Sequence, residues 1–127
     1  MRLYRLFNVS EHEPTCGLHF LGRDEAERYK ELVKWPYAND GLWPLADGRE
    51  LPLERLELRV EPLERHWLAE AELGLVVFEQ DGQLGGAPLL PGNCFDPDEW
   101  QAAPPAELAG PEVTLLWDKA RTALRAA

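Results

Sequence analysis

The residues that could bind a metal gather near the N-terminus. His12, Cys16 and His19 carry the nitrogen and sulfur ligands that zinc prefers, and Cys94 or His66 could add a fourth ligand. Their spacing matches none of the paired Cys/His patterns that are typical of zinc sites. A loop histidine followed by an outward-facing histidine on a strand would give the same pattern. We therefore predict no metal and no cofactor, and keep His12, Cys16 and His19 for an alternative function, a small metal- or ligand-binding enzyme.

The chain offers few groups for catalysis. Ser10 is the only serine, and no Gly-x-Ser-x-Gly turn is present. Cys94 lies among acidic residues, which raise the pKa of a thiol and make it less reactive. Carboxylates are plentiful, but nothing in the sequence fixes the separation that a hydrolytic pair needs. The glycine pair at 85–86 lacks the lysine of a phosphate-binding loop. We assign no catalytic residue and favour a non-enzymatic protein.

Two segments combine aromatic and acidic side chains, as protein-binding surfaces do. The first lies in a proline-framed loop and consists of Phe95, Asp96, Asp98, Glu99 and Trp100. The second lies in a repeated Trp-Pro pattern and consists of Trp35, Tyr37, Asp40, Trp43 and Asp47. Either set of aromatics could instead fold inward and fix its loop to the core. We predict that at least one of the two sets binds a partner.

The negative charge of the chain is concentrated in its middle. The net charge is −10, from 13 Lys and Arg against 23 Asp and Glu. Residues 1–35 carry six bases and six acids, whereas residues 66–110 carry eight acids and no base. Those eight acids are Glu70, Glu72, Glu79, Asp81, Asp96, Asp98, Glu99 and Glu107. Such a charge argues against direct nucleic-acid binding and against attraction to an anionic membrane.

A basic protein is the partner that this charge would attract. Our leading hypothesis is a non-enzymatic acidic binding domain that masks a basic surface of another protein. An inhibitor or an immunity protein for a toxin, such as a nuclease, works in this way. A further alternative is a structural subunit of a larger complex, docked through its C-terminal helix or an open sheet edge. The acidity could also serve solubility alone.

The length of 127 residues predicts one domain that spans 1–127. No stretch is long and apolar enough to cross a membrane, and the N-terminus lacks the features of a signal peptide. We therefore expect a cytoplasmic protein in which Cys16 and Cys94 are free thiols.

The predicted fold is α+β, with an antiparallel or mixed sheet of four to five strands packed by two main helices. The apolar run at 73–78 is followed by an Asp-Gly turn signal and predicts a central strand near 73–79 with both faces covered. Further strands are expected at 2–9, 16–21 and 54–61, with the first two forming a hairpin.

The two helices have different sequence signals. A helix at 24–34 should begin with a capping box of Asp24 and Glu27 and end before Pro36. Its buried stripe is expected to be Ala26, Tyr29, Leu32 and Val33. A helix at 111–126 is predicted from apolar residues that recur at three- and four-residue spacing.

The remaining segments carry weaker patterns. Residues 35–48 predict two successive turns with indole rings at their bases. Residues 63–72 favour a short helix, although alternation over 66–79 also fits one long strand. Residues 82–110 predict a long Pro/Gly-rich loop. Within that loop we expect a ragged edge strand at 83–91 and one helical turn capped by Asp96.

Overall fold

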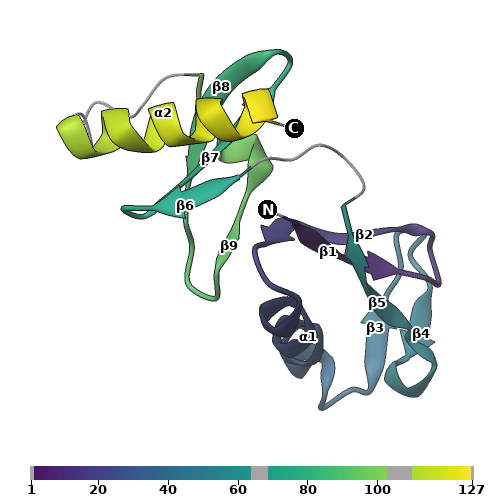
Figure 1. The fold of residues 1–127 in the computed structure, drawn as a ribbon. Coiled ribbons are helices and arrows are strands. Elements are labelled where there is room, and N and C mark those ends of the chain that lie inside the picture. Colours follow the sequence, from purple (N-terminus) through teal and green to yellow (C-terminus); the bar gives the residue numbers. More distant parts are fainter. Residues whose placement is uncertain (1, 64–68, 103–109, 127) are drawn as a thin grey trace.

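The computed structural model describes residues 2–63, 69–102 and 110–126, which form two α-helices and three antiparallel sheets (Figure 1). The strands are β1 (Tyr4–Asn8), β2 (Glu13–Phe20), β3 (Leu42–Pro44), β4 (Glu50–Pro52), β5 (Leu58–Pro62), β6 (Glu70–Glu72), β7 (Leu75–Gln80), β8 (Gln83–Pro88) and β9 (Cys94–Phe95). The α-helices are α1 (Arg23–Leu32) and α2 (Pro111–Ala126), and the 3-10 helices are η1 (Trp35–Tyr37), η2 (Leu53–Arg55) and η3 (Pro97–Glu99).

The fold confirms the α+β class but corrects the expectation of one sheet. Sheets of four, two and three strands are present, and all of their pairings are antiparallel. The reason is local pairing. β7 takes its neighbours β6 and β8, to which two-residue turns connect it, as partners and therefore does not join the N-terminal strands.

The four-stranded sheet has the order β5-β1-β2-β9, and α1 packs against it (Figure 1). Leu6, Phe20, Val60 and Cys94 from the four strands form a buried cluster with Ala26 of α1. β9 follows the C-terminal sheet in the chain but pairs with the end of β2. This pairing ties the two halves of the molecule together.

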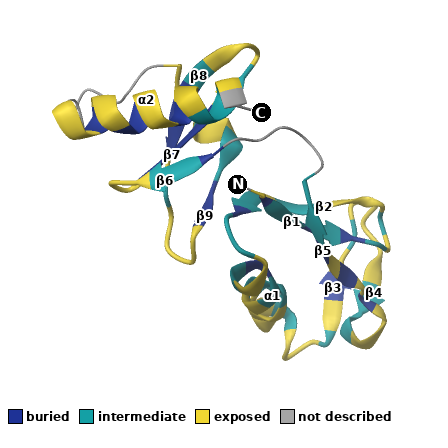
Figure 2. Ribbon diagram, in the orientation of Figure 1, coloured by how far each residue is buried: buried dark blue, intermediate teal, exposed yellow. Residues whose placement is uncertain are grey.

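β7 is the central strand of the three-stranded sheet, as predicted for the apolar run. Its residues from Leu75 to Phe78 are all buried (Figure 2). Leu75 and Val77 pack against α2, whereas Val76 and Phe78 belong to a second cluster that includes Leu3. The sheet therefore has a core on each face, and the predicted apolar stripe of α2 forms one of them.

Both turns of this sheet use left-handed backbone. Asp81 and Gly82 have φ values of +54° and +77°, as expected for the Asp-Gly hairpin that we predicted. Leu73 and Gly74 have φ values of +59° and +75° and form the turn before β7. The first two residues of the apolar run thus form an exposed turn, and the strand begins at Leu75.

Two glycines allow tryptophan rings to pack on opposite faces of β8. A Cβ atom at Gly85 would overlap the Trp100 ring and the carbonyl oxygen of Gln101. A Cβ atom at Gly86 would lie 3.0 Å from Cη2 of Trp117. β8 is consequently a regular strand, paired along its whole length with β7, and not the ragged strand predicted from its glycines.

The start of α1 differs from the prediction. Gly22 is the N-cap, and no side chain caps the helix, so the Asp24–Glu27 capping box is wrong. The helix starts one residue earlier than expected, which places Asp24 in its first turn. Glu25 folds back against Gly22, where a Cβ atom would overlap its carboxylate. A larger residue at position 22 would therefore require the Glu25 side chain to move.

The rest of α1 agrees in part. Its end before Pro36 is confirmed, and Ala26 is fully buried. Leu32 is 42% exposed and so does not belong to the buried stripe.

Three weaker predictions are corrected by β-structure. The predicted turns at 35–48 are interrupted by β3, which pairs with β4. Residues 70–72 form β6 and not the end of a helix, because they pair with β7. Residues 64–68 lie outside the described residues. The 82–110 region holds β8, β9 and η3 before 103–109, which are also not described.

Candidate functional site

The second aromatic–acidic set divides into a buried part and an exposed part. Trp43 is 8% exposed and lies in a cluster with Leu56 and Leu58, and its ring centroid is 5.0 Å from that of Tyr37. Trp35 is 71% exposed. Trp43 and Tyr37 therefore support the fold, whereas Trp35 projects into solvent.

The backbone around Trp35 is held by hydrogen bonds. The amide of Ala38 donates to the carbonyl of Trp35 at 3.1 Å, and the amide of Gly41 donates to the carbonyl of Tyr37 at 2.9 Å. The amide of Leu53 then donates to the carbonyl of Gly41 at 2.9 Å. The turn that carries Trp35 is thus fixed by hydrogen bonds to the β3–β4 region, and it leaves the indole ring exposed.

Asp40 and Asp47 have different roles in this set. Asp40 is exposed on the turn that follows Trp35. Asp47 accepts a hydrogen bond from the amide of Arg49 at 3.0 Å and pairs with its guanidinium at 2.6 Å. These contacts with the backbone and then the side chain of Arg49 lower the pKa of Asp47. Asp47 therefore stabilises the β3–β4 turn.

Of the aromatics in the first set, Phe95 lies in the core and Trp100 packs against it. Phe95 is fully buried and its ring centroid is 5.2 Å from that of Phe78. The indole N–H of Trp100 donates to the carbonyl of Phe78 at 3.1 Å. Phe95 is therefore not an exposed anchor. Trp100 is partly buried, because Gly85 leaves room for its ring against β8. A role of either residue in partner binding stays a prediction.

The acids of the first set surround η3. Asp96 accepts from the amide of Asp98 at 2.9 Å and caps η3, as predicted. Asp98 and Glu99 are exposed. Asp98 and Glu99 thus remain available to a partner, whereas Asp96 is engaged in the fold.

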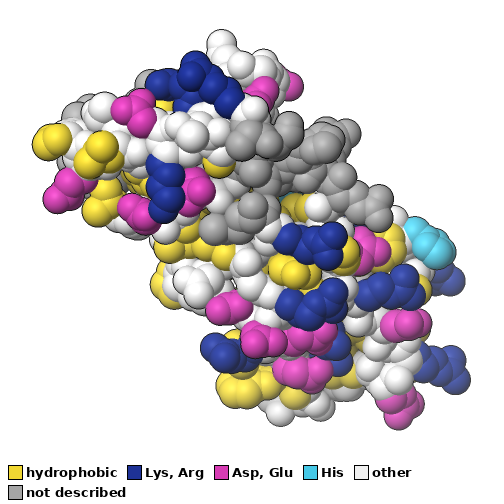
Figure 3. Space-filling view, in the orientation of Figure 1, with side chains coloured by type: hydrophobic (Ala, Val, Ile, Leu, Met, Phe, Trp, Pro, Cys, Tyr) yellow, Lys and Arg dark blue, Asp and Glu magenta, His cyan; other side chains and the backbone are white. Residues whose placement is uncertain are grey.

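The acids of the segment without Lys or Arg do not share one face. Glu70 and Glu72 lie beside α2 and pair with Lys119 at 3.4 and 2.8 Å. Asp98 and Glu99 lie beside Trp100, which packs on the opposite face of the sheet from α2. On the face seen in Figure 3, acidic side chains are interspersed with Lys and Arg. The acids described in this segment are therefore divided between at least two surfaces.

Two of the candidate metal ligands, Cys16 and His19, lie on β2 and are on opposite sides of it. Cys16 lies near Tyr29 of α1, whose pKa it raises after the larger effect of burial. His19 is on the other side, with its ring 5.6 Å from that of Phe95. Burial lowers the pKa of His19, Arg5 lowers it further, and Asp96 and Asp98 oppose this shift. Within the described ranges, no three His, Cys, Asp or Glu side chains form a group that could hold a metal, and His12, Cys16 and His19 do not converge.

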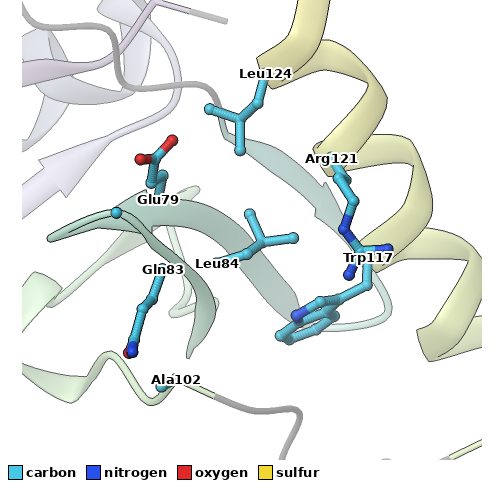
Figure 4. Close-up of a pocket in the computed structure, with 8 residues that line it drawn as sticks. Glu79, Gln83, Leu84, Ala102, Trp117, Arg121 and Leu124 are labelled. Atoms are coloured by element: carbon cyan, nitrogen blue, oxygen red, sulfur yellow. The ribbon is translucent and has the colours of Figure 1, made fainter.

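Sequence reasoning missed a groove between the β7–β8 hairpin and α2 (Figure 4). It has a volume of about 530 Å³ and is lined by Glu79, Gly82, Gln83, Leu84, Ala102, Trp117, Arg121 and Leu124. The sequence predicted the hairpin and the helix separately, and residues 117, 121 and 124 share a helix face by spacing. Their packing against β8 depends on contacts distant in the sequence.

The groove has two charged lining side chains, of which Arg121 is in an ion pair. The guanidinium of Arg121 pairs with Asp118 at 3.1 Å on the same helix. Glu79 is exposed on the opposite wall, and among the described residues no ion pair with it is found. The groove is a secondary candidate surface, since Trp35 is the more exposed aromatic.

No protein family, curated protein or solved structure matches this chain. Among the residues that the structure describes, no helix is long and apolar enough to span a membrane. The functional argument therefore rests on the surfaces described above.

Proposed function

We propose that this chain is a non-enzymatic acidic binding domain that docks on a basic surface of another protein with Trp35 as its central anchor. The observation that carries this proposal is the 71% exposure of Trp35 on a hydrogen-bonded turn. Tryptophan is enriched among the residues that dominate protein–protein binding energy. An indole held in solvent has no evident role in the stability of the fold.

The rigidity of the turn supports this role. Tyr37 of the same turn packs on the ring of Trp43, and the amide of Tyr37 donates to the carbonyl of Lys34 at 3.0 Å. A side chain presented on a fixed backbone loses less entropy on binding than one on a free loop.

Charge supports a basic partner. Residues 35–48 contain Asp40 and Asp47 and no Lys or Arg. Asp47 pairs with Arg49 at 2.6 Å, so its charge is partly compensated, whereas Asp40 is exposed. Lys34 is paired with Glu31 at 3.8 Å, so its charge is partly compensated. The whole chain has a net charge of −10. An acidic surface around an aromatic anchor accelerates association with a positively charged protein.

The proposed inhibitor role follows from the acidic charge of the domain. A small acidic domain that covers a basic site acts as an inhibitor, and an immunity protein that neutralises a toxin or nuclease is one such inhibitor. We assign no catalytic or cofactor role to the domain. The partner is a protein with a basic surface that contains a pocket for an indole ring.

Affinity capture tests the proposal. The chain is immobilised and exposed to extracts of the source organism, with Trp35→Ala as the test variant. Leu115→Ala is the matched control, because Leu115 is 67% exposed on α2. We expect the wild type and Leu115→Ala to retain the same basic protein, and Trp35→Ala to bind it about 30-fold more weakly. Equal retention by all three proteins would refute the role of Trp35.

A further inference from the structure

A second pocket lies between α1 and the segment that precedes β9, away from the groove of Figure 4. It has a volume of about 250 Å³ and is lined by Phe20, Glu25, Arg28, Tyr29, Leu32, Pro91, Gly92 and Cys94. The rings of Phe20 and Tyr29 contact each other with centroids 5.4 Å apart. Leu32, Pro91 and the Cys94 side chain complete an interior that is almost entirely apolar.

The floor of the pocket is uncharged. The thiol of Cys94 donates to the carbonyl of Pro91 at 3.4 Å. Burial raises the pKa of Cys94, and the nearby Cys16 raises it further. Cys94 therefore stays a neutral thiol at physiological pH and provides apolar surface rather than a nucleophile.

The wall opposite α1 is fixed in place. Gly92 and Asn93 have φ values of +88° and +52°, and the carbonyl of Asn93 accepts from the amide of Leu21 at 2.9 Å. The side-chain amide of Asn93 donates to Glu25 at 3.1 Å. These bonds join the loop to the start of α1 and fix this wall of the pocket.

The polar groups at the mouth are not equivalent. Hydrogen bonds from its own backbone N–H and from Asn93 lower the pKa of Glu25, with a smaller contribution from Arg28. Glu25 is therefore already engaged within the protein. Arg28 is exposed, and among the described residues no hydrogen bond or ion pair to its guanidinium is found. Arg28 is the group at the mouth that is available to a ligand.

We propose that this pocket binds a small monocarboxylate with an apolar or aromatic body, which Phe20, Tyr29 and Leu32 surround while Arg28 pairs with the carboxylate. A cavity of about 150 Å³ is sufficient for a benzene ring, so this pocket accommodates one ring with a short chain. The planar guanidinium matches a carboxylate with two parallel hydrogen bonds. Glu25 beside it disfavours a more highly charged group such as a phosphate monoester.

The site is separate from the proposed partner surface. Its occupant is a small molecule inside a cavity, whereas Trp35 is proposed to enter a pocket of another protein. A failure of ligand binding would leave the effect of Trp35→Ala on partner capture unchanged. Loss of partner capture would likewise leave ligand binding unchanged.

Titration with three matched probes tests the site. 3-Phenylpropanoate, 3-phenylpropanamide and 3-phenylpropylamine share one body and differ in the charge of the head group. Amide chemical shifts of Tyr29, Gly92 and Cys94 in the full chain report binding. We expect the carboxylate to bind with a Kd of about 1 mM, the amide about fivefold more weakly and the amine most weakly. Equal affinity for the carboxylate and the amide, or no shifts at the pocket, would overturn the proposal.

Variants then separate the roles of the residues. Arg28→Gln should remove the preference for the carboxylate over the amide, whereas Arg55→Gln, which removes another exposed positive charge, on η2, should retain it. Cys94→Met fills the interior and should weaken all three probes. If Cys94→Met does not fold, the Arg28→Gln comparison decides alone. A preference that survives in Arg28→Gln contradicts the assigned contact.

Discussion

Two Trp-Pro pairs lie close together in the chain and have opposite exposure. Trp35 is 71% exposed, and Trp43 is 8% exposed. Trp43 lies on β3, where pairing with β4 turns its ring toward Tyr37 and the cluster of Leu56 and Leu58. Trp35 lies on η1, which has no strand partner. Identical dipeptides thus serve folding in one place and remain available for binding in the other.

In the C-terminal half, two tryptophan rings pack against a sheet. Trp100 and Trp117 both pack on β8, and the adjacent glycines Gly85 and Gly86 provide the space for them. Both of these indole rings thus pack against the three-stranded sheet. The comparison shows that this fold packs other indole rings against its sheets. Trp35 is exposed because it lies on η1.

The largest effect is expected from truncation of the buried ring. Trp43→Ala should lower the free energy of unfolding by about 3–4 kcal/mol, because it leaves a cavity beside Leu56 and Leu58. Trp35→Ala should change it by less than about 0.5 kcal/mol. Urea denaturation measures both values. Similar losses in the two variants would remove the distinction between a folding residue and a binding residue.

Glycine substitutions test the packing of the C-terminal tryptophans. Gly85→Ala should cost about 2–3 kcal/mol, since its Cβ atom would overlap backbone as well as the Trp100 ring. Gly86→Ala should cost about 1 kcal/mol, because its Cβ atom would be 3.0 Å from the Trp117 ring, which can shift. Thermal and urea denaturation compare the two variants. A larger cost at Gly86 would contradict the described packing.

Charge reversal compares the two exposed acidic surfaces. Glu31→Lys with Asp40→Lys, near Trp35, should slow association with the captured partner about tenfold and reduce its salt dependence. Asp98→Lys with Glu99→Lys, on η3, should slow it about threefold, since these acids contribute only to the overall field. Asp96 is left unchanged because it caps η3. Association rates at several salt concentrations decide, and the reverse order would place the binding surface at η3.

The smallest effect concerns the turn after Trp43. The pKa of Asp47 is lowered by the backbone and side chain of Arg49, so the ionised form is favoured in the folded state. Its stabilising contribution is complete above the ordinary pKa of aspartate and is lost as the pH falls through the lowered value. Asp47→Asn should therefore lose less stability on acidification than the wild type does. Urea denaturation across this pH range measures the difference, and parallel curves would contradict it.

Local sequence signals predicted the elements that depend on local chemistry. The apolar stripe of α2, the buried run of β7, the turn at Asp81 and the cap at Asp96 are all present. The sequence signal for each consists of residues within a few positions of one another. The capping box at Asp24 failed because the helix begins at Arg23 with Gly22 as its N-cap, which places Asp24 inside the first turn.

The candidate surfaces depended on contacts that sequence patterns do not contain. Trp35 and Trp43 differ in exposure because Trp43 lies on β3, which pairs with β4. The burial of Trp100 depends on Gly85, which the sequence suggested would weaken a strand. The 250 Å³ pocket joins α1 to the loop before β9, far apart in the chain. The sequence therefore identified Trp35 within a set of candidates, and the fold distinguished it from the others.

Hydroxyl-radical footprinting of the captured complex tests the central claim most directly. In the free chain, Trp35 should be oxidised readily, because its side chain is exposed, and Leu115 should also react. In the complex, we predict that oxidation of Trp35 falls about tenfold while that of Leu115 is unchanged. Oxidation of Trp35 at the same rate in the free chain and in the complex would contradict its role as the anchor.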